Sequence, residues 1–126
     1  MGHNIAIAGR TGMAHYCMST RRWKLFGNET QEKDFIVSGG ILWWRDYIIV
    51  GCYSILDNAD EIRFYSKESK LDNKFSKVIK LHSPILLINN LQDQLVTFDS
   101  DAQVNIWSMR KIDTGKCNML NIFLVM

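Results

Sequence analysis

The stretch Leu95-Val-Thr-Phe-Asp-Ser-Asp-Ala-Gln-Val-Asn-Ile-Trp107 decides the fold class of this 126-residue chain. Two short runs of β-branched and aromatic residues flank a polar turn at Asp99-Ser100-Asp101, a pattern typical of a hairpin. Similar apolar runs, bounded by turn residues, recur from Ile5 onward, and the chain has a single proline. We therefore expect an all-β protein of about ten short strands that needs no helix.

The expected strands follow one another at short intervals. They cover residues 5–8, 13–18, 23–26, 41–43, 47–53, 61–66, 75–81, 85–88, 94–98 and 103–109. The run 47–53 is almost continuously apolar, which is typical of a strand buried on both faces. Residues 29–33 and 67–74 are longer polar connections. The glycines of Gly9-Arg-Thr-Gly12 precede no expected helix, so we interpret them as a strand turn and not as a phosphate loop.

An internal repeat narrows the fold class. The pattern of Trp44-Arg45-Asp46 returns in Leu91-Gln92-Asp93, and that of Ile62-Arg63-Phe64-Tyr65 in Val104-Asn105-Ile106-Trp107. A period of roughly 40–45 residues with four strands per unit is typical of a β-propeller of the WD40 kind. The sequence therefore predicts a partial WD40-like propeller, with about one full blade plus two partial ones.

The length of the chain sets a limit on this propeller. A ring needs at least about four blades, which 126 residues do not supply. Either the chain is a piece of a larger propeller, which we favour, or it exposes two apolar sheet faces and open edges. We assign residues 1–110 to the partial propeller. Residues 117–126 fit neither strand rhythm nor blade turn, and we interpret residues 111–126 as a divergent tail at a truncation or splice boundary.

Composition excludes several classes of protein. The net charge of +2, with 47% hydrophobic and 22% charged residues, is typical of a folded globular chain and argues against a dedicated nucleic-acid binder. Cys17, Cys52 and Cys117 form no disulfide framework, and neither they nor the histidines have metal-ligand spacing. We find no catalytic constellation and expect no enzyme activity, cofactor or metal.

Two features are candidates for an interaction surface. Lys67, Lys70 and Lys74 begin a basic run that continues through Lys77 and Lys80, and Arg21, Arg22 and Lys24 form a smaller one. Either run is suited to anionic lipid or an acidic partner, although Glu68 and Asp72 interrupt the longer run, as in an ordinary solvated exterior.

The second feature is the tandem pair Trp43-Trp44. Adjacent residues of a strand point to opposite faces, so one ring can fill the core between two blades. The other ring then lies either in the opposite packing layer, which we favour, or at the rim as a binding hot spot.

Several segments resemble the Ric-one family. The resemblance is carried by residues 2–16, by Trp23-Lys-Leu-Phe-Gly-Asn-Glu-Thr-Gln-Glu32, by Val37-Ser-Gly-Gly-Ile-Leu-Trp-Trp44, and by Leu71-Asp-Asn-Lys-Phe75. It extends nearly without gaps from residue 2 to about residue 110, whereas residues 111–126 depart from the family pattern. The chain therefore resembles an internal fragment of the large WD40-containing subunit of a guanine-nucleotide exchange complex.

The resemblance implies a function at the Golgi. The family protein is much longer, with propeller repeats and a helical C-terminal region, and it pairs with the smaller, arrestin-like Rgp-one subunit. The complex is cytosolic, is recruited to the peripheral Golgi membrane, and releases GDP from the Rab GTPase called Rab six in retrograde endosome-to-Golgi transport. The resemblance assigns no GTPase contact within this stretch. The alternative is a generic WD40 adaptor of a coat or tether complex without exchange activity.

Overall fold

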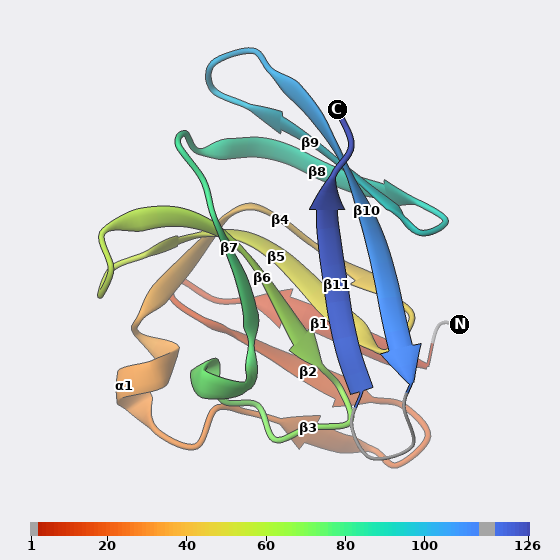
Figure 1. The fold of residues 1–126 in the computed structure, drawn as a ribbon. Coiled ribbons are helices and arrows are strands. Elements are labelled where there is room, and N and C mark those ends of the chain that lie inside the picture. Colours follow the sequence, from red (N-terminus) through yellow and green to blue (C-terminus); the bar gives the residue numbers. More distant parts are fainter. Residues whose placement is uncertain (1–2, 114–117) are drawn as a thin grey trace.

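The computed structural model describes residues 3–113 and 118–126 as three antiparallel sheets packed face to face (Figure 1). The first sheet contains β1 (Asn4–Ala8), β2 (Met13–Cys17) and β3 (Arg22–Lys24). The central sheet contains β4 (Phe35–Trp44), β5 (Tyr47–Ser54), β6 (Ala59–Ser66) and β7 (Lys77–Lys80). The third contains β8 (Ile85–Leu91), β9 (Gln94–Asp99), β10 (Val104–Asp113) and β11 (Asn118–Leu124). The all-β, partial-propeller fold class is confirmed.

The internal repeat corresponds to matching positions in two blades. Both four-stranded sheets are meanders in which neighbouring strands follow one another in the chain. Arg45 and Gln92 occupy the turns between first and second strands, with φ of 51° and 54°. Asn58 and Ala102 occupy the turns between second and third strands, with φ of 51° and 62°. The repeat therefore encodes the same left-handed turn residues as well as the same strands.

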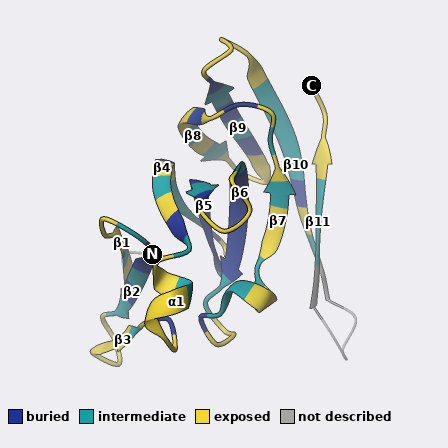
Figure 2. Cartoon of the chain, turned by 90° about the vertical axis from the view of Figure 1, so that its left-hand side faces the viewer, coloured by how far each residue is buried: buried dark blue, intermediate teal, exposed yellow. Residues whose placement is uncertain are grey.

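The central sheet is buried on both faces, as the apolar run at 47–53 predicted. Along β5 the side chains alternate between two cores: Ile48 and Val50 face the first sheet, and Tyr47 and Ile49 face the third. Figure 2 shows the buried residues gathered in β5 and β6, between the sheets on either side. Each outer sheet thus covers one apolar face of the central sheet.

Glycines allow the central and third sheets to approach closely. A Cβ atom on Gly39 of β4 would lie 2.8 Å from the Ile85 side chain of β8. Gly51 of β5 packs behind Gly39, since a Cβ atom on Gly51 would lie 3.2 Å from the Gly39 backbone. Gly40 has φ of +115°, a conformation that other residues rarely adopt, at the point where the register between β4 and β5 shifts. The bulge and the small residues therefore set the spacing between these two blades.

The expectation that no helix is needed is wrong at both polar connections. Residues Glu29–Glu32 form the short helix α1, because the Asn28 side chain accepts a hydrogen bond from the Gln31 N–H at 3.0 Å. Residues Asn73–Phe75 form a single 3-10 turn, capped in the same way by Asp72, so β7 begins at Lys77 and not at Phe75. In both segments, which were predicted only as polar connections, a capping side chain stabilises a helical turn.

The expectation that residues 117–126 fit no strand is also wrong. β10 continues to Asp113, and β11 pairs with it from Trp107↔Leu124 to Asp113↔Asn118. This pairing supplies the fourth strand of the third sheet. The described residues therefore form two four-stranded sheets and a three-stranded one, where one full blade and two partial ones were expected. The pattern was missed because the apolar residues of 118–126 do not alternate with polar ones. The boundary drawn after residue 110 stays a prediction.

The outward faces of the end sheets carry exposed apolar side chains. On the first sheet, Ile5 and Ile7 are 46% and 49% exposed, and Trp23 is 54% exposed beside Tyr16. On β8, the exposed apolar residues are Leu86, Leu87 and Leu91. Apolar sheet faces of this kind are normally covered in a folded assembly.

Enlarging Gly39 should separate the central and third sheets. We expect Gly39→Val to lower the free energy of unfolding by about 1–3 kcal/mol, because the branched side chain cannot fit against Ile85. Gly27→Val is the matched control, since a Cβ at that exposed position lies 3.9 Å from its nearest neighbour. Urea unfolding followed by circular dichroism measures both; equal losses would contradict the packing argument.

The exposed faces should make the isolated chain associate. We expect size-exclusion chromatography with light scattering to show species larger than the monomer. Ile5→Lys combined with Ile7→Glu should raise the monomer fraction by charging the outward face of the first sheet. Leu56→Lys should leave it unchanged, because Leu56 is 82% exposed on a turn away from that face. A wild-type chain that is a sharp monomer would refute the prediction.

Candidate docking surface

A hollow of about 680 Å³ lies where the first sheet meets the loop after β6. We call it the basic hollow. Its lining includes three cationic side chains, one acidic side chain, and polar residues of β2 and of the turn that follows it: Arg22, Lys24, Lys67, Glu68, His15, Cys17, Ser19 and Thr20. The excess of positive charge makes this hollow the candidate docking site for an anionic group.

The register of the first sheet explains why these side chains gather. Cys17 lies opposite Arg22, and His15 lies opposite Lys24, so the four side chains share one face of the sheet. Arg21, with φ of 57°, makes the tight turn that brings β3 back beside β2. The pattern of strand, turn and strand therefore places two cationic residues next to a thiol and an imidazole.

Lys24 joins this sheet to the loop after β6. Its Nζ donates to the Lys67 carbonyl oxygen at 2.6 Å and to the Ser69 carbonyl oxygen at 3.1 Å. These bonds hold Lys67 at the hollow, although it lies 43 residues away in the chain. The smaller basic run and the start of the longer run, recognised separately in the sequence, thus meet at one site.

Burial and positive charge act together on His15. The residue is only 4% exposed, and its ring packs edge-on against Trp43, with ring centroids 5.7 Å apart. Burial, followed by the charges of Lys24 and Lys67, lowers the pKa of His15 to about 4. His15 is therefore neutral near pH 7, and its Nε2 atom is buried without a hydrogen-bond partner.

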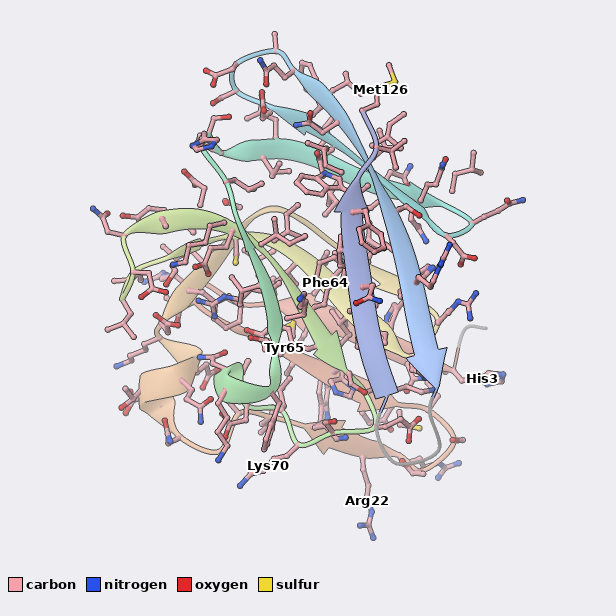
Figure 3. The ribbon with its side chains drawn as sticks, in the orientation of Figure 1. His3, Arg22, Phe64, Tyr65, Lys70 and Met126 are labelled. Atoms are coloured by element: carbon pink, nitrogen blue, oxygen red, sulfur yellow. The ribbon has the colours of Figure 1, made fainter. Side chains whose placement is uncertain are left out.

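The predicted lysine run does not form one surface. Lys67 lines the basic hollow, Lys70 is exposed on the loop, and the Lys74 Nζ lies 5.0 Å from the centre of the Phe75 ring. Figure 3 shows Arg22 and Lys70 pointing outward from the lower edge of the molecule. At the other end of the run, Lys80 forms ion pairs with Asp57 and Glu61 at 3.2 and 3.3 Å. An interaction role for Lys67, Lys70 and Lys74 stays a prediction, strongest for Lys67.

Trp43 and Trp44 point to opposite faces of β4, as expected. Trp43 is half-buried against the core shared with the first sheet. Trp44 is buried in the core shared with the third sheet, and its Nε1 donates to Asp93 Oδ1 at 3.1 Å. The structure thus places both rings in packing layers between sheets. A role of Trp43 and Trp44 in binding stays a prediction. The burial of the two rings argues against it.

A second cluster of charges is buried and structural. Arg63 donates to Glu61 at 2.8 Å, to Asp34 at 3.0 Å and to the Tyr65 hydroxyl at 3.1 Å, and its guanidinium lies over the Phe35 ring. Every partner comes from this chain, and Arg63 is 3% exposed. This network ties β6 to the segment after α1 and leaves little of the guanidinium for a ligand.

The described residues, 3–113 and 118–126, give two further negative findings. Within them, no group of three or more histidine, cysteine or acidic residues has the geometry to hold a metal ion. No helix of this part of the chain is long and apolar enough to cross a membrane.

Two members of the hollow were not predicted from the sequence. Cys17 and His15 lie in a short strand with no motif around them, and only the pairing of β2 with β3 places them beside Arg22 and Lys24. The one available signal was alternation, since residues 15 and 17 must share a face of a strand. Cys117, the third cysteine considered in the sequence, lies outside the described residues.

Comparison with known proteins adds independent information. The family model for the RIC1 second β-propeller domain matches residues 1–125. The guanine nucleotide exchange factor subunit RIC1 of Homo sapiens is 42% identical over 115 residues, which cover 91% of this chain. The subunit R06F6.8 of Caenorhabditis elegans, named in the same way, is 34% identical over 116 residues, or 90% of this chain. The match spans 8% of the length of each of these relatives. No solved structure matches significantly.

The neutral state of buried His15 predicts how stability depends on pH. Its pKa is about 4 in the folded chain and 6.5 when unfolded. Between these values the unfolded chain binds a proton that the folded chain does not, so stability falls as the pH drops from 6.5 toward 4. We expect a loss of about 1–3 kcal/mol, measured by urea unfolding across this range.

His15→Gln removes the titrating group and should flatten this pH dependence. His82→Gln, at an exposed position, is the matched control and should keep the wild-type curve. The same acid-induced loss in the His15 variant would show that other groups cause it.

Proposed function

The chain belongs to the family of the RIC1 second β-propeller domain, and on this premise we propose that it serves as a scaffold and docking segment of a guanine-nucleotide exchange factor subunit. The relatives that it matches are named as such subunits, and the match covers most of this chain. The observation that carries the docking part of the proposal is the meeting of Arg22, Lys24 and Lys67 at one hollow.

The proposal extends to the setting in which such a subunit works. The partner is the smaller, arrestin-like Rgp-one subunit, and the target is the Golgi GTPase Rab six. The complex works from the cytosol at the peripheral Golgi membrane, in retrograde endosome-to-Golgi transport. The support for this setting is the resemblance of the sequence to the Ric-one family; the names of the relatives support the exchange-factor subunit alone.

Nucleotide exchange requires differential binding and not a reactive side chain. An exchange factor that prefers the nucleotide-free GTPase lowers the affinity of the GTPase for GDP by the same coupling free energy. A rigid sheet that presents charged groups at fixed positions meets this requirement. The features on which the proposal rests are of this kind: a central sheet packed on both faces, with a positively charged hollow at one seam.

The hollow is suited to an acidic segment of a partner. Arg22 is exposed, Lys67 is half-buried, and Lys24 is held in place by two carbonyl oxygens. Fixed cations lose less conformational entropy on binding than free ones, and their charge steers the approach of an acidic surface. Glu68 at the same hollow would disfavour a partner with no positive charge to pair with it.

Charge reversal at the hollow tests the proposal. The reconstituted exchange complex would carry Arg22→Glu with Lys67→Glu, and GDP release from the GTPase would be measured with a fluorescent nucleotide. We expect release to slow by roughly threefold to tenfold, which corresponds to losing one or two partly exposed charge contacts. Lys77→Glu, an exposed lysine on β7, is the matched control and should have no effect.

Two results would contradict the proposal. A GDP release rate that the wild-type complex leaves unchanged would end the exchange role. Capture of coat or tether proteins without any GTPase would then favour the adaptor alternative. A charge-reversed complex as active as wild type would keep the exchange role but remove the basic hollow from it.

A further inference from the structure

Cys17 lies in the basic hollow in a setting unlike that of the other described cysteine. Its side chain is partly exposed, and its Sγ lies 3.1 Å from the Ser19 hydroxyl oxygen. Cys52 of β5, in contrast, is 3% exposed in the core between the first and central sheets. Neither is in a disulfide. Of these two described cysteines, Cys17 is therefore the one placed to meet a reagent from solution.

An independent feature of the same hollow points to a ligand. His15 lines the hollow and is only 4% exposed. Its Nε2 atom has no hydrogen-bond partner. A buried nitrogen without a partner carries a desolvation cost that a hydrogen-bonding ligand group would offset. The volume of about 680 Å³ falls within the range of roughly 300–1,000 Å³ that is typical of small-molecule sites.

We propose that the basic hollow is a thiol-modification site, in which Cys17 exchanges with an acidic disulfide of the glutathione class. Arg22, Lys24 and Lys67 would face the carboxylates of such a disulfide, and His15 lines the same hollow. This site goes beyond the proposed docking function and does not depend on it.

The exchange is balanced without any further reactant. The Cys17 thiol loses its proton to solvent, and the thiolate attacks one sulfur of glutathione disulfide. A bond forms between Cys17 and that sulfur while the glutathione S–S bond breaks. The second glutathione leaves as a thiolate with the electron pair and takes up a proton. Cys17 is oxidised to a mixed disulfide, and one glutathione is reduced.

The local environment favours the thiolate of Cys17. Hydrogen bonds from Ser19 and Thr20 lower the pKa of the Cys17 thiol to about 6. Burial instead raises the pKa of Cys52 to about 12, so that thiol stays protonated. The charged and titratable groups that share the hollow with Cys17 are His3, His15, Arg22, Lys24, Lys67 and Glu68. Three of them, Arg22, Lys24 and Lys67, are cationic side chains, and they also attract an anionic disulfide.

Site-resolved kinetics test the proposal on the full 126-residue chain. The chain is treated with glutathione disulfide across a pH series, quenched in acid, and mapped by peptide mass spectrometry. We expect the adduct on Cys17 to form at a rate whose pH midpoint lies near 6, and we expect Cys52 to stay unmodified. Ser19→Ala should move the midpoint upward, because it removes a donor to the thiolate, and Cys17→Ser should abolish the adduct.

The role of the cations is measured with a second probe. Cystamine is a disulfide that carries positive charge. The ratio of the rates at which Cys17 reacts with cystamine and with glutathione disulfide therefore reports the electrostatic potential at Cys17. We expect Arg22→Gln with Lys67→Gln to lower the preference for glutathione disulfide by roughly threefold or more at low salt. Lys77→Gln is the control and should keep the wild-type ratio.

Three outcomes would overturn the site. These are an unreactive Cys17, a midpoint close to the ordinary thiol pKa of about 8.5, and a probe ratio that the hollow variants leave unchanged. None of these results bears on GDP release, so failure of this site is distinguishable from failure of the docking function.

Discussion

The double burial of the central sheet is the constraint on which the rest of the structure depends. Ile48 and Val50 lie in one core, and Tyr47 and Ile49 lie in the other, so β5 has no face for solvent. A sheet of this kind is stable only between two covering layers, because hydrophobic stabilisation scales with the apolar area removed from water. The outer sheets are therefore parts of the core, although each carries an exposed apolar face of its own.

Close packing of these layers fixes where charged groups lie. Gly39 and Gly51 bring the central sheet so near to β8 that Ile85 fills the gap, and Asp93 of the next turn comes within reach of Trp44 and Arg45. Lys111 of β10 reaches Asp46 at 2.8 Å in the opposite direction. Aspartates at equivalent repeat positions thus both join the central and third sheets, one from each side.

The seam on the other side of the central sheet has a different character. There the first sheet meets a loop, and the polar groups leave a hollow that the chain does not fill. Met13, His15 and Cys17 lie on the same face of β2, and Met13 is buried in the core. One strand therefore contributes both a core residue and two residues of the hollow. A seam of this kind combines a rigid frame with unpaired groups, which is the combination that recognition of a partner or a small ligand needs.

The sequence by itself determined the strands, the turns and their recurrence. Alternating and continuous apolar runs fix which segments form strands, and the paired Asp46 and Asp93 turns fix the blade repeat, because both depend on residues close together in the chain. These patterns did not predict the short helix at Glu29–Glu32 or the strand Asn118–Leu124. The first depends on a single cap, and the second depends on an edge that only β10 provides.

Only the tertiary structure decided which residues meet. Lys24 and Lys67 belong to separate basic runs, and no local pattern indicates that the amine of one holds the backbone of the other. Trp43 and Trp44 were suited to a core or a rim, and the two neighbouring sheets bury Trp44 in one core and leave Trp43 half-buried against the other. The reason is physical: side-chain periodicity specifies a face of a strand, whereas the partner of that face is set by packing between segments far apart in the chain.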